Sequence, residues 1–243
     1  MEIALVLVIV GLLVGLVLRA WELQVNARVR TLAAATQDIQ VAYLGFIDRF
    51  HRIPGDWNAT AAGAGIGTSI NGGGNDSGQL DHPAGAAAYS EVNALWEQVS
   101  KAGFISGTYA GSAATEPSAS NNLAPMNVYN GVIIVGITDD YQGAATKRLN
   151  VVIGRGLPVG VARELDVKLD DAAPETGRVR ASPADAAVTV FAGTNNWGGQ
   201  DGSCVYQPVA GPVSSKKKAP PPVGPSRWDT GARRQDCNVV TLF

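Results

Sequence analysis

The first twenty residues constrain the fold most, because residues 3–18 contain no charged or polar side chain. The run starts directly after Glu2, and no proline interrupts the chain before Pro54. A helix rises about 1.5 Å per residue, so the apolar residues 3–18 alone span slightly less than the thickness of a bilayer's hydrocarbon core. The pattern predicts one long helix over residues 1–53, in which residues 1–20 form a segment for a membrane or for the core of a filament.

From Trp21 the pattern becomes amphipathic. Apolar residues recur every three or four positions as far as Ile53, with arginine, aspartate and glutamine between them. This spacing predicts that one face of the helix packs on its own domain. The opposite face has two interpretations, which are contact with water and contact with other subunits.

The glutamate, the apolar run and the amphipathic continuation, in this order, resemble the N-terminal segment of type IV pilins and of type II secretion pseudopilins. Glu2 matches the family glutamate, and IALVLVIVGLLVG at residues 3–15 matches the run behind it. The family is made with a basic leader that is cut a few residues before the glutamate. Here Met1 directly precedes Glu2, so we expect that the natural first residue lies upstream or that the chain was truncated.

The resemblance implies a structural subunit that waits in the bacterial inner membrane and is handled by a pilus or secretion machinery. It then joins copies of itself or other pilins in an extracellular or periplasmic helical filament. Glu2 would pair with the N-terminal amine of a neighbouring subunit and so set the axial register. Two alternatives are a low-copy binding subunit, such as an adhesin or a DNA-capture pilin, and a monomeric membrane-anchored protein.

Residues 54–243 are expected to form a globular head of short elements and long loops. Pro54 ends the long helix, and residues 58–87 are rich in glycine and alanine and are predicted to be a loop. The predicted elements are helices at 88–102 and 158–169, an antiparallel strand pair at 128–138 and 148–153, edge strands at 178–181 and 187–192, and an irregular tail from Asn195. Their order predicts an α+β fold, with a small antiparallel sheet packed on the long helix.

One glycine-rich stretch, NGGGNDSGQLD at residues 71–81, carries several side-chain oxygens. Asparagine and aspartate among glycines can wrap Ca²⁺, and the candidate ligands are Asn71, Asn75, Asp76 and Asp81. The spacing differs from that of an EF-hand, and a flexible loop explains the same composition. Nearby, the triplet that starts at Asn58 is an N-x-T glycosylation acceptor for an exported chain.

The chain has two cysteines, Cys204 and Cys237. In an exported protein they are expected to form one disulfide, which closes the loop 204–237. Six basic and two acidic residues lie inside the loop. The basic residues are Lys216, Lys217, Lys218, Arg227, Arg233 and Arg234. They form either a binding surface for DNA or another polyanion, or simply a solvated surface.

Catalytic motifs are missing from the sequence. It contains no G-x-S-x-G, no H-E-x-x-H, no P-loop and only two histidines. The acidic pairs Asp139–Asp140 and Asp170–Asp171 are adjacent in predicted loops, which is a poor arrangement for acid–base catalysis. The formal net charge of -2 favours no charged partner. We therefore expect a protein that is not an enzyme and that needs no cofactor, apart from the calcium interpretation above.

Overall fold

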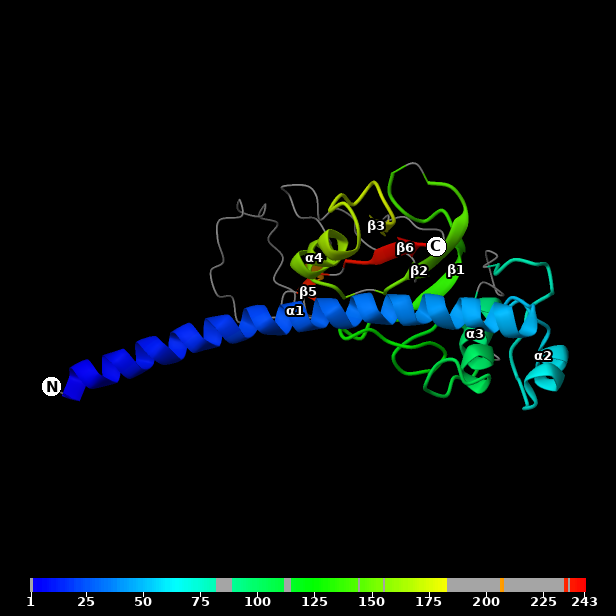
Figure 1. The fold of residues 1–243 in the computed structure, drawn as a ribbon, viewed down its shortest axis with the longest axis horizontal. Helices are drawn as coiled ribbons and strands as arrows, with labels where there is room; N and C mark the ends of the chain where they lie inside the picture. Colours follow the sequence, from blue (N-terminus) through cyan, green and yellow to red (C-terminus); the bar gives the residue numbers. More distant parts are fainter. Residues whose placement is uncertain are drawn as a thin grey trace, which may run out of the picture.

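The structure is a computed structural model of the 243-residue chain. It describes residues 2–81, 89–111, 115–143, 145–154, 156–182, 206–207, 234–235 and 237–243. The back part of a long helix, α1 (Glu2–Phe50), runs in Figure 1 between the sheet and α4 above it and α2 and α3 below it, and its front part extends far beyond them. The predicted α+β class and the long N-terminal helix are confirmed, and the helix ends three residues earlier than predicted.

The back part of α1 is the support on which the body is built. The residues that it buries recur at helical spacing, and they are Val29, Leu32, Thr36, Ile39, Ala42, Tyr43 and Phe46. Phe46 packs in one apolar cluster with Trp57 and Trp96, whereas Leu32 packs in a second cluster. Burial of a side chain of this size stabilises the fold by about 1.5–3 kcal/mol.

Four strands form one antiparallel sheet in the order β1-β2-β6-β3. They are β1 (Ile134–Thr138), β2 (Arg148–Val152), β3 (Val179–Ala181) and β6 (Val239–Leu242). A separate pair consists of β4 (Tyr206–Gln207) and β5 (Arg234–Gln235). The prediction of an irregular tail is therefore wrong for β6, an inner strand of the sheet, because its four residues are all buried between two neighbouring strands.

The predicted strand at 128–138 is only half present. Its first half is a turn in which the Asn127 side chain accepts hydrogen bonds from the N–H groups of Tyr129 at 2.7 Å and Gly131 at 2.9 Å. Asn130 has a φ of 61°, which β-branched strand residues avoid but asparagine tolerates. The side chain of Asn127 thus competes with strand pairing, and β1 begins only at Ile134.

Three short helices complete the described body, namely α2 (Ala59–Ile66), α3 (Ser90–Lys101) and α4 (Val159–Leu169). The last two confirm the predicted helices. Helix α2 corrects the prediction of a loop over 58–87. Its alanines favour a helix, Asn58 caps its start, and Gly67 ends it with a φ of 84°.

Candidate functional site

The front half of α1 is an apolar surface that the other described parts of the chain leave exposed. The large apolar side chains described between Ile3 and Val17 are 48–79% exposed. This part of the helix projects away from the sheet and from the other helices (Figure 1). Soluble monomers rarely expose so large a contiguous apolar surface, and such surfaces mark contacts with a protein or a membrane. Glu2 is the first residue of α1, and its side chain lies outside the described part.

Taken over the residues that the structure describes, the helices lack the combination of length and apolar character needed to cross a membrane.

A pocket of about 510 Å³ lies beside the back half of α1, and we call it the Asp38 pocket. Its lining includes Ala35, Asp38, Val41 and Ala42 of α1, together with Phe104 and Met126 from other segments. Asp38 is the charged residue of the lining, which is otherwise mostly apolar. Val41 and Met126 are 71% and 46% exposed, so the mouth of the pocket carries apolar side chains that face solvent.

A second pocket, of about 640 Å³, lies between α1 and α4. Arg28 and Tyr129 line it together with Glu164, and the Arg28 guanidinium lies 5.1 Å from the centre of the Tyr129 ring. This is the geometry of a cation–π contact, so Arg28 already has a partner within the chain.

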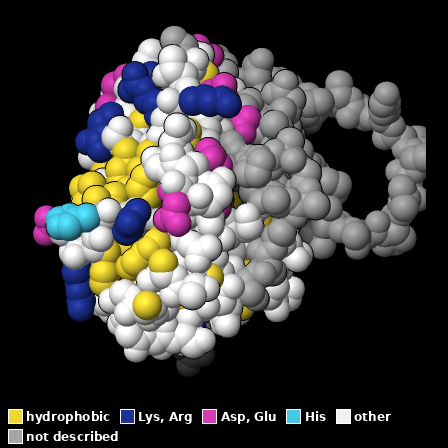
Figure 2. All heavy atoms as spheres, turned by 90° about the vertical axis from the view of Figure 1, so that its right-hand side faces the viewer, with side chains coloured by type: hydrophobic (Ala, Val, Ile, Leu, Met, Phe, Trp, Pro, Cys, Tyr) yellow, Lys and Arg dark blue, Asp and Glu magenta, His cyan; other side chains and the backbone are white. Residues whose placement is uncertain are grey.

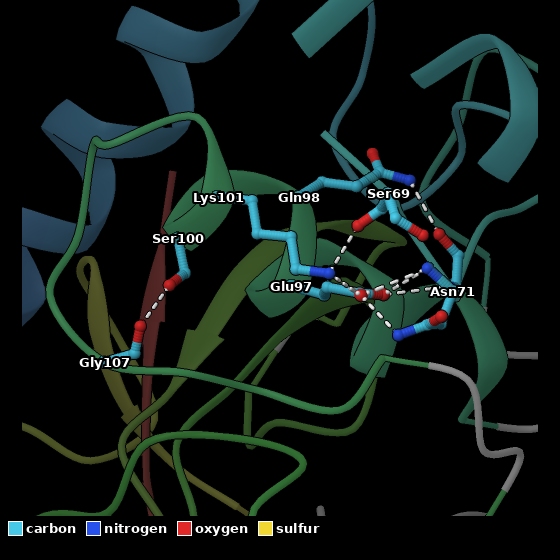
Figure 3. A network of polar contacts seen from close by, with 8 residues as sticks. Ser69, Asn71, Glu97, Gln98, Ser100, Lys101 and Gly107 are labelled. Atoms are coloured by element: carbon cyan, nitrogen blue, oxygen red, sulfur yellow. Dashed lines mark hydrogen bonds and ion pairs between the residues drawn. The ribbon is translucent and has the colours of Figure 1, made fainter. Parts of the chain in front are cut away.

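The start of the glycine-rich loop is held by Glu97, a fully buried residue of α3 (Figure 3). Its carboxylate accepts hydrogen bonds from the N–H groups of Asn71, at 3.0 and 3.1 Å, and of Gly72, at 2.8 Å. The Asn71 side-chain amide donates a further bond of 3.0 Å. Lys101, one turn along α3, lies 2.7 Å from the same carboxylate. These donors satisfy a charge that would otherwise be costly to bury.

The neighbouring residue Gln98 ties two separate segments to α3. Its side-chain oxygen accepts a 2.9 Å hydrogen bond from the N–H of Gly55. Its side-chain nitrogen donates to the carbonyl oxygens of Trp57, at 2.9 Å, and Gly72, at 3.1 Å. The turn after α1 and the glycine-rich loop are therefore fixed to the same helix.

Two more carboxylates hold the end of the loop. Asp56 accepts the N–H groups of Ser77, at 2.9 Å, and Gly78, at 2.8 Å, and Glu91 accepts that of Asp81 at 2.7 Å. Burial raises the pKa of Glu91 to about 7, and the charges of Asp56 and Asp81 add to the rise while the Asp81 N–H partly offsets it. Glu91 is thus a buried acid that changes its charge near neutral pH.

The four candidate calcium ligands are used in different ways. Asn71 directs its side-chain nitrogen to the α3 carboxylate described above. Asn75 accepts the N–H of Ser77 at 2.8 Å, and Asp81 accepts the Ser77 hydroxyl at 3.2 Å. Asp76 has a φ of 57°. The described contacts bring Asn75 and Asp81 to Ser77, whereas Asn71 bonds to Glu97. Calcium binding stays a prediction.

A small hollow of about 230 Å³ lies next to the loop, with His51, Arg52, Asp56 and Asp76 in its lining. Figure 2 views the molecule from this end, where apolar, basic and acidic side chains are intermixed. Neither sign of charge dominates this face, so it offers no broad electrostatic attraction for a polyanion.

An acidic cluster that we did not predict from the sequence lies where α4 meets β3. Oxygens of Asp166, Asp170 and Asp171 lie within 4.8 Å of one another. Asp170 accepts the N–H of Val179 at 2.9 Å, and the Thr176 hydroxyl, bonded to Asp171 at 2.6 Å, holds the pKa of Asp171 below its ordinary value. The available signal was that Asp166, on the predicted helix 158–169, lies four residues before Asp170, the first residue after that helix. These bonds indicate that Asp170 and Asp171 order the turn after α4.

The glycosylation candidate Asn58 is exposed and has a structural task. Its side-chain oxygen accepts the N–H of Thr60 at 3.0 Å and caps α2. Helix capping explains an asparagine at this position without a glycan, and glycosylation stays a prediction.

The disulfide and the basic loop fall mostly outside the described residues. Cys237 is fully buried, is disulfide-bonded, and pairs its backbone with Leu157. Outside the described part lie Cys204, Lys216, Lys217, Lys218, Arg227, Arg233 and the predicted strand 187–192, and only the backbone of Arg234 is described. The anion-binding surface and the pairing of the two cysteines therefore stay predictions.

Comparison of the chain with family models, with curated proteins and with solved structures gives no match. The geometry of the chain itself must therefore carry any functional conclusion.

Proposed function

We propose that this protein is a structural subunit of a type IV pilus or pseudopilus filament, assembled through α1. The observation that carries the proposal is the exposure of the apolar side chains of residues 3–17 on a helix that leaves the body. In a filament, the front halves of many α1 helices pack together and cover this surface, and the bodies lie outside. Gly11 and Gly15, which have open space around them, allow two such helices to approach closely.

Glu2 has a specific part in this proposal. A carboxylate inside a bundle of apolar helices is costly unless a positive charge or hydrogen-bond donors answer it. The N-terminal amine of a neighbouring subunit is such a group, and pairing with it fixes the axial position of one subunit against the next. Before assembly, the same apolar segment holds the subunit in the bacterial inner membrane, where a pilus or secretion machinery takes it up.

The continuity of α1 also supports the proposal. The helix runs for 49 residues, and among the positions whose burial the structure describes the first buried one is Val29. The body therefore grips the back part of the helix and leaves the front part free for other copies. A helix anchored in this way passes a force along the filament axis directly into the body.

The test is the Glu2→Leu variant, made in the cells that produce the protein. Surface material is sheared off, sedimented, and searched for this chain by mass spectrometry and electron microscopy. We expect Glu2→Leu to abolish sedimentable filaments while the body stays folded. Glu175→Leu, which removes an exposed acid in a loop of the body, is the matched control and should assemble normally.

Two outcomes would overturn the proposal. Normal filament yield from Glu2→Leu would show that filaments do not need Glu2 to pair with the N-terminal amine of a neighbouring subunit. Failure of the unmodified chain to sediment as a polymer under any condition would favour the monomeric membrane-anchored protein instead.

A further inference from the structure

The exposed face of the front half of α1 carries one charged residue within an apolar stripe. Leu12, Leu16, Arg19 and Leu23 follow one another at steps of four, three and four residues, so they share one face of the helix. The three leucines are 65–70% exposed, and Arg19 is exposed as well. Within the described contacts, Arg19 makes no ion pair, so the stripe presents an unanswered positive charge between leucines.

The Asp38 pocket presents the complementary arrangement. Its charged residue, Asp38, is exposed and makes no ion pair within the described contacts. Around it are apolar walls, with Phe104 and Met126 opposite the α1 side. On α1 itself, the small residues Ala35 and Ala42 flank Asp38 at steps of three and four residues. The pocket therefore offers one negative charge between two small apolar residues, of which Ala35 is partly exposed and Ala42 is only 4% exposed.

The two patterns match at a single offset. A parallel α1 helix shifted by 19 residues places the last three residues of the stripe opposite residues of the pocket: Leu16 opposite Ala35, Arg19 opposite Asp38, and Leu23 opposite Ala42. Large side chains then face small ones, which is how helices interdigitate. At 1.5 Å per residue this offset is about 28 Å, so the same two charges cannot meet within one straight helix.

We infer that the Asp38 pocket binds the Leu16–Leu23 segment of α1 from a second copy of this chain, with Arg19 paired to Asp38. The inference rests on the proposed filament, and it adds which surface of the body receives a neighbouring helix and at what stagger. Arg30 is also exposed on α1, but the residues three and four positions away from it are Asn26, Ala27, Ala33 and Ala34. These residues around Arg30 therefore include no leucine that could fill an apolar pocket.

Charge exchange tests the pairing directly in the full-length chain. Arg19→Glu and Asp38→Arg alone are each expected to lower the yield of sheared, sedimented filaments at least tenfold. The double variant with both changes is expected to restore the yield to within about threefold of the unmodified chain. Arg30→Glu, on the same helix but outside the stripe, is the matched control and should leave the yield unchanged. Circular dichroism of each purified variant checks that the body is folded.

A cross-link provides a second readout of the same contact. Copies carrying Leu23→Cys are mixed with copies carrying Val41→Cys, at the edge of the pocket, and oxidised during assembly. We expect a covalent dimer. The partner variant Val167→Cys, which places a thiol at another exposed apolar position, on α4, should give none.

Either single charge variant assembling normally, or a double variant no better than the single ones, would overturn the inference. So would filaments that form without the 23–41 cross-link. In these cases the unmodified chain still forms filaments that depend on Glu2, so the proposed function survives. If the unmodified chain forms no filament, the proposed function fails, and the inference fails with it.

Discussion

The backbone N–H of Asp81 donates a 2.7 Å hydrogen bond to the carboxylate of Glu91, a side chain that is only 5% exposed. This bond joins the end of the glycine-rich loop to the first turn of α3. Because burial raises the pKa of Glu91 to about 7, the acceptor of the bond is partly protonated at neutral pH. The attachment of the loop is thereby linked to pH.

The first prediction concerns this linkage. In the unfolded chain Glu91 ionises near 4.5, and in the folded protein near 7, so the folded state holds the proton more tightly. Glu91 therefore contributes about 2 to 3 kcal/mol to the free energy of unfolding below pH 4.5, where it is protonated. This contribution is lost as the pH rises through 7. Thermal melting of the detergent-solubilised chain at pH 5 and pH 8 measures it. Glu91→Gln should show a much smaller difference between the two pH values.

Glu175→Gln, which removes an exposed carboxylate, is the control and should follow the unmodified protein at both pH values. If Glu91→Gln and the unmodified protein have parallel melting temperatures across this range, Glu91 does not titrate as described here.

The second prediction compares two glutamates, each with a lysine four residues further along its helix. Glu97 lies 2.7 Å from Lys101 and is fully buried, whereas Glu164 lies 2.8 Å from Lys168 with both side chains partly exposed. Glu97→Ala should lower the free energy of unfolding by about 3 kcal/mol, because it leaves the buried N–H of Gly72 and the partly buried N–H of Asn71 without an acceptor. Glu164→Ala should cost below about 0.5 kcal/mol. Equal losses in denaturant unfolding would show that burial is not the deciding factor.

The third prediction uses two glycines that share a left-handed backbone. Gly111 has a φ of 69° and Gly67 a φ of 84°. A Cβ at Gly111 would collide with the Glu97 carboxylate, whereas a Cβ at Gly67 would meet open space. Gly67→Ala should therefore cost about 1 kcal/mol for the backbone alone, and Gly111→Ala about 3 kcal/mol. Urea unfolding curves of the two variants measure the difference, which should shrink but not disappear in a Glu97→Ala background, because the Cβ of residue 97 stays within 2.6 Å of the added Cβ.

The elements with strong local periodicity were predictable from the sequence. The three- and four-residue steps from Trp21 onward gave the amphipathic part of α1, and the β-branched runs gave β1 and β2. Helix α2 was missed because glycines among its alanines suggested a loop, although Asn58 is a good helix cap. Strand β6 was missed because a short apolar run behind a long proline-rich stretch has too little local signal.

The residues that hold the glycine-rich loop were not predictable in the same way. Glu91 and Glu97 lie on a helix whose apolar spacing marked Trp96 as core, and that prediction was correct because Trp96 is 1% exposed. The partners of the two glutamates are backbone N–H groups of residues 71–81, which a sequence pattern does not display. The oxygen-rich loop attracted the calcium interpretation, whereas the carboxylates that contact its backbone come from α3 and from the turn after α1.

The strand order has a consequence for how the protein is made. β2 and β3 do not touch in the sheet, because β6 lies between them, yet β6 follows both along the chain. As the chain emerges from the ribosome or from a translocation channel, β1 and β2 can pair at once. β3 stays unpaired, because the position between β2 and β3 is empty until β6 follows. The four-stranded sheet is therefore completed only when residues 239–242 insert between β2 and β3. A premature stop codon just upstream of Val239 would remove β6, the strand that joins β2 to β3.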